Sequence, residues 1–254
     1  MKVKKILVSQ AKPASDKSPY FDIADKFGVD VVFRPFIKVE SLSAREFRAQ
    51  KLSLADFTAV IFTAKIAVDN YFRLAEETRF SVPDTMKYFC TNKNIADYLQ
   101  KYIVYRKRKI FKAETGHLAD LIPFMLKHKT DKYLYAVSET DINDDSAVLD
   151  ANKIDYKRGA LYRTVSNDFG PDEPFDYDML VFFSPHGIES LVKNFPDFDQ
   201  KDIVVAVFGN NTANTAREAG LRVDIAAPTP EAPSMTLAID NYLHANQAEA
   251  TPQA

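Results

Sequence analysis

The sequence predicts an α/β protein with two flavodoxin-like lobes, each built on a parallel sheet that is covered by helices. Strand-like and helix-like segments alternate along the whole chain of 254 residues, which is typical of parallel sheets with crossover helices. Two apolar strands that run directly into a helix start resemble each other, at residues 60–68 and at residues 180–188. Each is followed, after roughly 25 residues, by another apolar strand that ends in small polar residues, which indicates a hidden duplication.

Apolar periodicity and helix-start signals define the elements of the first half of the chain. Pro19 follows Ser18 at a helix start, where a missing backbone N–H is tolerated. Pro35 excludes a central place in a sheet for the extended segment around it, because proline cannot donate to a neighbouring strand. Ser43 and Glu46 have the spacing of a capping box. The predicted elements are strand 5–9, helix 18–27, extended 29–39, helix 43–50, strand 57–63, helix 67–78, strand 87–91, helix 95–101, strand 103–105 and helix 116–127.

The second half of the chain continues this alternation. Gly220 stands where a helix ends, since glycine readily adopts the left-handed conformation that closes helices. Residues 245–254 lack apolar periodicity, and we expect this tail to be disordered. The predicted elements are strand 132–137, helix 144–151, extended 157–165, a polar linker 167–176, strands 179–183, 204–208 and 223–226, and helices 187–194, 211–219 and 234–244.

The number of strands predicts how the chain divides into domains. The last block contributes only three strands and needs residues 6–9 and 31–33 to complete a sheet. We therefore expect a discontinuous outer α/β domain, residues 1–36 and 166–254, and an inserted α/β domain, residues 37–165. Two extended crossovers form a two-stranded connector between them. Strand-to-helix turns at the carboxyl ends of parallel strands bind ligands, so two such lobes predict an active-site cleft between them.

Composition excludes several classes of function. Hydrophobic residues make up 46% of the chain, charged residues 27%, and the formal net charge is -2, so no overall field attracts nucleic acid or an anionic membrane. No apolar run approaches the roughly 18 residues of a membrane span, and we expect a cytoplasmic monomer. The single cysteine, Cys90, lies in an apolar run, which predicts an inert core thiol without a disulfide or a cysteine-based metal site.

Several segments along the chain together resemble one enzyme family. They are Ile6-Leu7-Val8-Ser9-Gln10, Ala160-Leu161-Tyr162-Arg163-Thr164-Val165, Phe182-Phe183-Ser184-Pro185-His186-Gly187-Ile188, Phe208-Gly209-Asn210-Asn211-Thr212-Ala213, Gly220 and Ala226-Ala227-Pro228-Thr229-Pro230. Their order and spacing resemble the uroporphyrinogen-III synthase family, over the chain up to about residue 242. The middle of the chain departs from the family pattern, because Ala64 and Ala67 replace its usual serine and glycine.

The resemblance implies an activity as well as a fold of two α/β lobes. The family acts on hydroxymethylbilane, a linear tetrapyrrole with eight carboxylates, in heme and tetrapyrrole biosynthesis. The implied reaction is that of a lyase: it removes the terminal hydroxyl as water, inverts ring D through a spiro intermediate, and closes uroporphyrinogen III. The pyrroles supply the electrons, so the resemblance implies neither a metal nor another cofactor. The absence of phosphate-binding glycine motifs and of paired-histidine ligand spacing agrees with this.

The resemblance also implies which residues form the site. It implies Tyr162 as the proton donor to the departing hydroxyl, because a phenol donates while it stays neutral; a merely packed tyrosine is the alternative. Helix N-termini offer free backbone N–H groups that suit carboxylates. The substrate-binding residues implied are Ser184, Pro185, His186, Gly187, Gly209, Asn211, Thr212, Pro228, Thr63, Ala64, Lys65, Gln10 and Ser138. The alternative for Ser184 and Thr212 is that they only cap helices.

Two further interpretations stay open, a role for a basic run and a non-catalytic binding protein, and a hydrolase is disfavoured. The basic run at residues 106–109 could collect carboxylates, although such a run is more often a solvated edge. His117 and His186 stand at helix starts without a serine or aspartate partner at recognisable spacing, which disfavours a hydrolase triad. The alternative to an enzyme is a non-catalytic two-lobe protein that binds an anionic small molecule.

Overall fold

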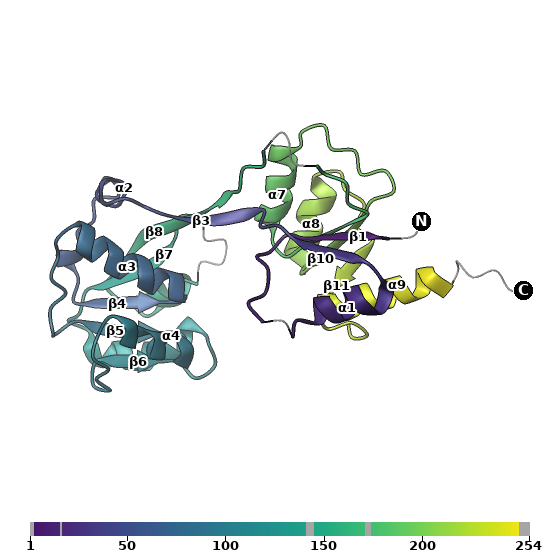
Figure 1. Cartoon of the computed structure of the whole chain (residues 1–254). Coiled ribbons are helices and arrows are strands. Elements are labelled where there is room, and N and C mark those ends of the chain that lie inside the picture. The colour runs from purple at the N-terminus through teal and green to yellow at the C-terminus, as the bar shows by residue number, and fades with distance from the viewer. Residues whose placement is uncertain (1–2, 16, 141–144, 171–173, 249–254) are drawn as a thin grey trace, which may run out of the picture. The chain divides into compact units, whose positions relative to one another are not determined.

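The structure is a computed structural model that describes residues 3–15, 17–140, 145–170 and 174–248 (Figure 1). The chain divides into two compact units. The first unit combines Met1–Lys38 with Val165–Ala254, and the second is Val39–Thr164. Each unit contains one sheet in which parallel pairing dominates, with helices packed on both faces. The predicted fold class, two α/β lobes with parallel sheets, is confirmed.

The first unit contains a five-stranded sheet in the order β11-β10-β9-β1-β2, with every neighbouring pair parallel. Its strands are β1 (Lys5–Val8), β2 (Asp30–Phe33), β9 (Met179–Phe182), β10 (Val204–Phe208) and β11 (Ile225–Ala227). Counted within the unit, this is the order 2-1-3-4-5 of flavodoxin-like sheets. Strand β1 pairs with β2 on one side and with β9 on the other, so the two parts of the discontinuous unit share one sheet.

Four helices in the described part of the unit cover this sheet, two on each face. Helices α1 (Pro19–Phe27) and α9 (Met235–Ala248) pack together on one face, and α7 (Pro185–Asn194) and α8 (Asn210–Glu218) on the other. Alternation along the strands separates the two cores, because Ile6 and Val8 join the α1–α9 cluster while Leu7 joins the α7–α8 cluster. Figure 1 shows α1 and α9 side by side.

The second unit contains a six-stranded sheet in the order β3-β8-β7-β4-β5-β6. Its strands are β3 (Ile37–Ser41), β4 (Ala59–Phe62), β5 (Lys87–Cys90), β6 (Ile110–Lys112), β7 (Tyr133–Ser138) and β8 (Tyr156–Ser166). The five strands from β8 to β6 are parallel and follow the order 3-2-1-4-5 when counted from β4, the other common doubly wound order. Strands β3 and β8 are neighbours, and each crosses a boundary between the two units.

Longer helices cover one face of this sheet and short helical turns cover the other. One core cluster joins the sheet to helices α2, α3 and α4, and a second joins it to α5, α6 and neighbouring 3-10 turns. These elements are α2 (Ala44–Ala49), α3 (Lys65–Glu77), α4 (Lys93–Tyr98), α5 (Ile122–Met125), α6 (Ala147–Ala151) and 3-10 turns η1 (Leu54–Asp56), η2 (Leu99–Lys101), η3 (Leu118–Leu121) and η4 (Leu126–His128). Cys90 is fully buried in the first cluster, and burial raises the pKa of its thiol to about 12, as expected of an inert core residue.

Three expectations about elements are wrong. The strand predicted at residues 103–105 is absent, and the edge strand is β6, which begins only at Ile110. The helix predicted over residues 116–127 is broken into 3-10 turns around α5, because Pro123 lacks a backbone N–H and is tolerated only in a first helical turn. Residues 245–248 continue α9 instead of starting a disordered tail, and residues 249–254 lie outside the described part. No helix in the described part is long and apolar enough to cross a membrane.

Close packing at Gly159 on β8 gives a test of the second core. A Cβ atom added there would lie 2.6 Å from Cδ1 of Leu134 and 3.3 Å from Cε2 of Phe47, and both side chains are buried. We expect Gly159→Ala to lower the free energy of unfolding by about 1–3 kcal/mol, because the core must shift to admit the methyl group. Urea unfolding followed by circular dichroism measures this.

A double-mutant cycle shows whether the clash with Leu134 is the cause. Leu134→Ala destabilises by itself through the cavity that it leaves, but it removes the clashing atom. Gly159→Ala should therefore cost less in the Leu134→Ala background than in the wild type. Equal costs in both backgrounds would contradict this explanation.

Candidate functional site

Each sheet has one place where the order of strands reverses. In the first unit this switch point lies between β1 and β9, and in the second between β4 and β7. The helices that follow the paired strands cover opposite faces, α1 and α7 in the first unit and α3 and α6 in the second. Loops therefore diverge at the carboxyl ends of these strands, which is where doubly wound sheets bind ligands. These two edges are the candidate functional sites.

The first edge is formed by the turn between β9 and α7 and by the end of β1. The Oγ atom of Ser184 accepts a hydrogen bond from the backbone N–H of Gly187 at 3.3 Å, and Pro185 occupies the first helical position. Ser184 therefore caps α7, as the alternative interpretation expected. A Cβ atom added to Gly187 would lie 3.8 Å from Oγ of Ser184 and 3.9 Å from Oγ of Ser9. The structure thus brings Ser9 to this turn, a residue that sequence reasoning did not select.

The neighbouring strand β10 ends in a second helix start. Gly209 caps α8 with φ 87° and ψ 148°, a conformation that is almost confined to glycine, and its N–H donates to the carbonyl of Ala227 at 2.6 Å. Thr212 lies inside the first turn of α8 and is 2% exposed, so the expectation that it could be the cap is wrong. Asn211 is exposed, and Pro228, also exposed, follows a cis peptide bond.

Two other residues predicted for this unit lie near its edge. Gln10 follows Ser9 and is exposed to solvent. The Nδ1 atom of His186 lies 2.8 Å from a carboxylate oxygen of Glu189 one turn further along α7. Hydroxyl, amide and imidazole groups and two helix N-termini therefore gather at the carboxyl ends of β1, β9 and β10. Such a set can bind carboxylates without a metal ion.

The second edge begins with the turn between β4 and α3. Thr63 and Ala64 are half-buried, and Lys65 is exposed as the first residue of α3. Ala64 at the cap position has no side-chain oxygen, so backbone N–H groups at the start of this helix of 13 residues lack a side-chain cap. The Lys65 ammonium lies 5.4 Å from the centre of the Tyr98 ring. This helix start therefore combines free backbone donors with a cation.

On the other side of this switch point, β7 ends beside Tyr162 of β8. The register pairs Ser138 with Tyr162, but Val137 pairs with Ala160, so Leu161 is an extra residue in a bulge. The bulge lets Leu161 and Tyr162, which are adjacent in the chain, both join the core cluster that faces α3. Tyr162 is only 8% exposed. Ser138 and Tyr162 thus come together, and Tyr162 packs with hydrophobic residues.

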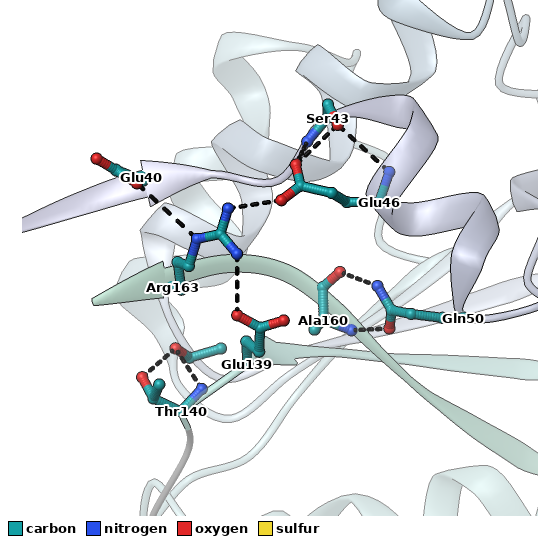
Figure 2. A network of polar contacts seen from close by, with 9 residues as sticks. Glu40, Ser43, Glu46, Gln50, Glu139, Thr140, Ala160 and Arg163 are labelled. Atoms are coloured by element: carbon teal, nitrogen blue, oxygen red, sulfur yellow. Dashed lines mark hydrogen bonds and ion pairs between the residues drawn. The ribbon is translucent and has the colours of Figure 1, made fainter. Parts of the chain in front are cut away.

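An arginine next to Tyr162 organises this edge (Figure 2). The guanidinium of Arg163 contacts carboxylate oxygens of Glu46, Glu139 and Glu40 at 2.5, 3.3 and 3.8 Å. These glutamates belong to α2, the end of β7 and β3 respectively, so Arg163 ties three segments to β8. Arg163 lies in the segment 160–165 that resembles the family, but the resemblance implied no role for this residue. Its charge already faces three carboxylates, so we assign it to positioning and not to substrate binding.

Two side chains of α2 add further contacts to β8 beside the Arg163 cluster (Figure 2). Glu46 completes the predicted capping box: one of its oxygens accepts from the Ser43 backbone N–H at 2.8 Å and from the Ser43 hydroxyl at 2.7 Å. These bonds and the contact with Arg163 lower the pKa of Glu46 to about 2. Gln50 accepts from the Ala160 N–H and donates to the Ala160 carbonyl, both at 2.9 Å. Helix α2 therefore holds the segment of β8 that carries Tyr162.

Other candidates lie elsewhere in the fold. Residues 106–109 precede β6, and the amino and carboxyl ends of parallel strands lie at opposite edges of a sheet, so this basic run does not join the switch point. His117 is exposed before η3. The predicted residues of each unit thus lie along the carboxyl edge of its sheet, at or beside the switch point, and the basic run does not.

The chain is similar to known proteins in sequence and in fold. A family model described as uroporphyrinogen-III synthase HemD matches residues 20–236. A uroporphyrinogen-III synthetase structure from Helicobacter pylori is 16% identical with a TM-score of 0.59, over 95% of this chain and 99% of that one. A mutant uroporphyrinogen III synthase from Thermus thermophilus is 14% identical with a TM-score of 0.52, over 96% and 99%. No curated protein sequence matches the chain. The two structures show that the fold is shared.

The lowered pKa of Glu46 gives a testable dependence of stability on pH. Its pKa in the folded chain is about 2, against an ordinary value of 4.5, so its contribution is complete above pH 4.5 and is lost as the pH falls towards 2. We expect Glu46→Gln to be less stable than the wild type near neutral pH. The difference in free energy of unfolding should shrink steadily below pH 4.5. Urea titrations at several pH values measure it.

A matched control separates this effect from general acid destabilisation. Glu76 is exposed on α3 and takes no part in the Arg163 contacts, so Glu76→Gln should leave the profile nearly unchanged. A stability difference for Glu46→Gln that stays constant from pH 6 to pH 3 would contradict the assignment, because part of the Glu46 contribution should already be lost between pH 4.5 and about pH 3.

Proposed function

Because the chain belongs to the uroporphyrinogen-III synthase family, we propose that it converts hydroxymethylbilane to uroporphyrinogen III as a cyclising hydro-lyase. The observation that carries this proposal is the family match over residues 20–236. The position of the predicted residues along the carboxyl edge of the sheet in each unit supports it. The terminal hydroxyl leaves as water, ring D is inverted through a spiro intermediate, and a carbon–carbon bond closes the macrocycle.

The difficult part of this reaction is positioning. A hydroxymethyl group on an electron-rich pyrrole ionises with modest acid assistance, because the ring stabilises the cation. The same cation can also close head to tail without inversion of ring D. The protein must therefore hold a flexible molecule with eight carboxylates so that the spiro route is faster, and orientation alone can supply several orders of magnitude in rate.

Three helix N-termini suit these carboxylates. Those of α7 and α8 lie at the carboxyl ends of neighbouring strands in the first unit, and that of α3 lies at the switch point of the second. Backbone N–H groups and the helix dipole favour anions at such positions. The exposed ammonium of Lys65 adds a charge at α3. We assign the predicted residues around these starts to substrate binding.

Tyr162 is the proposed proton donor to the departing hydroxyl. Its position beside Ser138, at the carboxyl end of β7, supports this assignment, and Arg163 together with α2 positions the strand that carries it. A phenol can donate its proton to the departing hydroxyl, which leaves as water. The phenolate then regains a proton from the ring carbon that loses one when the new carbon–carbon bond forms and the pyrrole becomes aromatic again. No metal or cofactor is needed in this scheme.

A second candidate function rests on the burial of Tyr162. This side chain is 8% exposed and packs in the hydrophobic core, which is what a structural tyrosine would show. Alanines at positions 64 and 67 also replace the family's usual serine and glycine. These features favour a non-catalytic protein that binds an anionic small molecule with the same helix starts.

The remaining properties belong to the same proposal. The outer domain is residues 1–36 with 166–254 and the inserted domain is residues 37–165; compact units that divide at Lys38/Val39 and Thr164/Val165 support this. We propose a cytoplasmic monomer that binds a tetrapyrrole and no nucleic acid. The formal net charge of -2 supports the last point, since it provides no general attraction for a polyanion.

Product analysis tests the proposed reaction directly. Porphobilinogen is converted by hydroxymethylbilane synthase in the presence of this protein, and the products are oxidised and separated as type I and type III porphyrin isomers. We expect the type III isomer to dominate. Type I alone, at ample protein concentration, would exclude the synthase and leave the binding protein.

The roles of Tyr162 and Ser184 can be separated by their effects on kcat and KM. Tyr162→Phe removes only the hydroxyl and should lower kcat by roughly 10- to 10⁴-fold with little change in KM. Ser184→Ala should instead raise KM, through lost contacts of about 1–2 kcal/mol. Melting temperatures identify any effect of the lost helix cap. Full activity of Tyr162→Phe would remove Tyr162 as the acid.

A further inference from the structure

A cavity of about 390 Å³ lies in the second unit, away from the switch point. It is lined at the amino ends of β5 and β6 by Tyr88, Lys109 and Ile110, and by the segment that follows η2. The predicted substrate residues of this unit lie at the carboxyl ends of β4 and β7. In a parallel sheet these are opposite edges, so the cavity is separate from the candidate site.

Aromatic and aliphatic side chains form the walls of this cavity. The rings of Phe72 and Tyr102 stack with centres 4.5 Å apart and planes within 7°, and the Tyr88 ring lies 6.3 Å from Phe72. Val82 and Ile103 add apolar surface. Flat ring faces beside aliphatic groups favour a planar apolar ligand, because aromatic groups pack in offset or edge contacts with such walls.

The charged groups of the cavity favour an anion. Arg106 and Lys109 line it, and Asp84 is the one carboxylate among the residues that do. Asp84 is highly exposed and its nearest contact with Arg106 is 3.9 Å, a weak surface pair. Within the described residues, Lys109 makes no ion pair. The lining therefore carries an excess positive charge that its own carboxylate does not neutralise.

Tyr88 also lines this cavity. The residue as a whole is 3% exposed, and within the described residues its phenol makes no hydrogen bond. Burial raises its pKa, so the hydroxyl stays protonated and available as a donor. A donor without a protein partner in the wall of a cavity is free to donate to a ligand acceptor.

We propose that this cavity binds a small molecule with one or two fused aromatic rings that carry a carboxylate. The rings would pack between the Phe72–Tyr102 pair and the aliphatic walls, with the carboxylate at Arg106 and Lys109 and accepting from Tyr88. A volume of about 390 Å³ lies at the low end for small-molecule pockets, which suits one or two rings and not a tetrapyrrole. The site is thus additional to the proposed substrate site.

Binding of 2-naphthoate to the full chain, measured by isothermal titration calorimetry, tests this proposal. Its neutral amide, 2-naphthamide, has the same rings without the charge. We expect naphthoate to bind about tenfold more tightly than the amide, because charge-assisted hydrogen bonds to arginine and lysine are the stronger class. Equal affinities, or no binding of naphthoate at about 1 mM, would overturn the proposal.

One lysine variant and one arginine control variant test where the molecule binds. Lys109→Gln should weaken naphthoate binding about 5- to 20-fold and leave naphthamide nearly unchanged. Arg108→Gln is the matched control, since Arg108 belongs to the same basic run and is exposed but does not line this cavity. Equal losses in both variants would mean a general charge effect. An unchanged affinity for naphthoate in Lys109→Gln would place the ligand elsewhere. Either of these two results overturns the proposal.

The Tyr88 hydroxyl provides a second, independent readout. Tyr88→Phe keeps the ring and should weaken naphthoate binding about 3- to 10-fold, with the melting temperature unchanged or raised. The temperature should not fall, because within the described residues the Tyr88 hydroxyl makes no hydrogen bond that the variant could break. Unchanged naphthoate affinity in Tyr88→Phe would contradict the assigned orientation of the carboxylate.

Discussion

The pairing of β1 with β9 holds the first unit together, and Asp178 sits where that pairing begins. Its carboxylate accepts hydrogen bonds from the backbone N–H groups of Lys4 and Lys5 at 2.7 and 2.9 Å, and its own N–H donates to the Lys5 carbonyl at 2.9 Å. Both strands are interior, with β2 beyond one and β10 and β11 beyond the other. A long segment of the chain separates β1 from β9. The entropic cost of closing such a loop grows only slowly with its length, so the pairing remains favourable. The same pairing creates the switch point at which Ser9 meets the start of α7.

In the second unit a bulge and a cluster of charged side chains fix the position of β8 against its neighbours. The extra residue at Leu161 shifts the alternation of side chains along β8 by one residue. As a result Tyr162 packs in the core on the side of α3. Arg163 then meets three glutamates from segments that are distant in the sequence. Exposed ion pairs contribute little singly, and this cluster matters chiefly because it sets where β3, β7 and α2 lie against β8. The arrangement of this edge thus depends on contacts among the protein's own charged groups.

The fold was largely predictable, and the site only in part. Short continuous apolar runs predicted β4, β5, β9 and β10, because parallel strands are buried on both faces. The same pattern was misleading at residues 103–105, where Ile103 and Val104 line a cavity and Val104 is 77% exposed. A short apolar run alone does not separate a strand from a loop. Ser184 was predicted by its place before a helix. Ser9 was missed, although a hydroxyl at the end of a strand beside a switch point is a usable signal.

By itself the sequence determined the two α/β lobes, the helix starts and the residues that resemble a known family. These properties are local: they depend on apolar runs, capping residues and prolines that act within a few positions. Tertiary structure alone decided which strand ends are neighbours, that Thr212 lies inside a helix whose cap is Gly209, and that Tyr162 is packed in a core. It also decided that Arg106 and Lys109 line a cavity with Tyr88. These outcomes depend on register and on pairing between distant strands, which no short segment encodes.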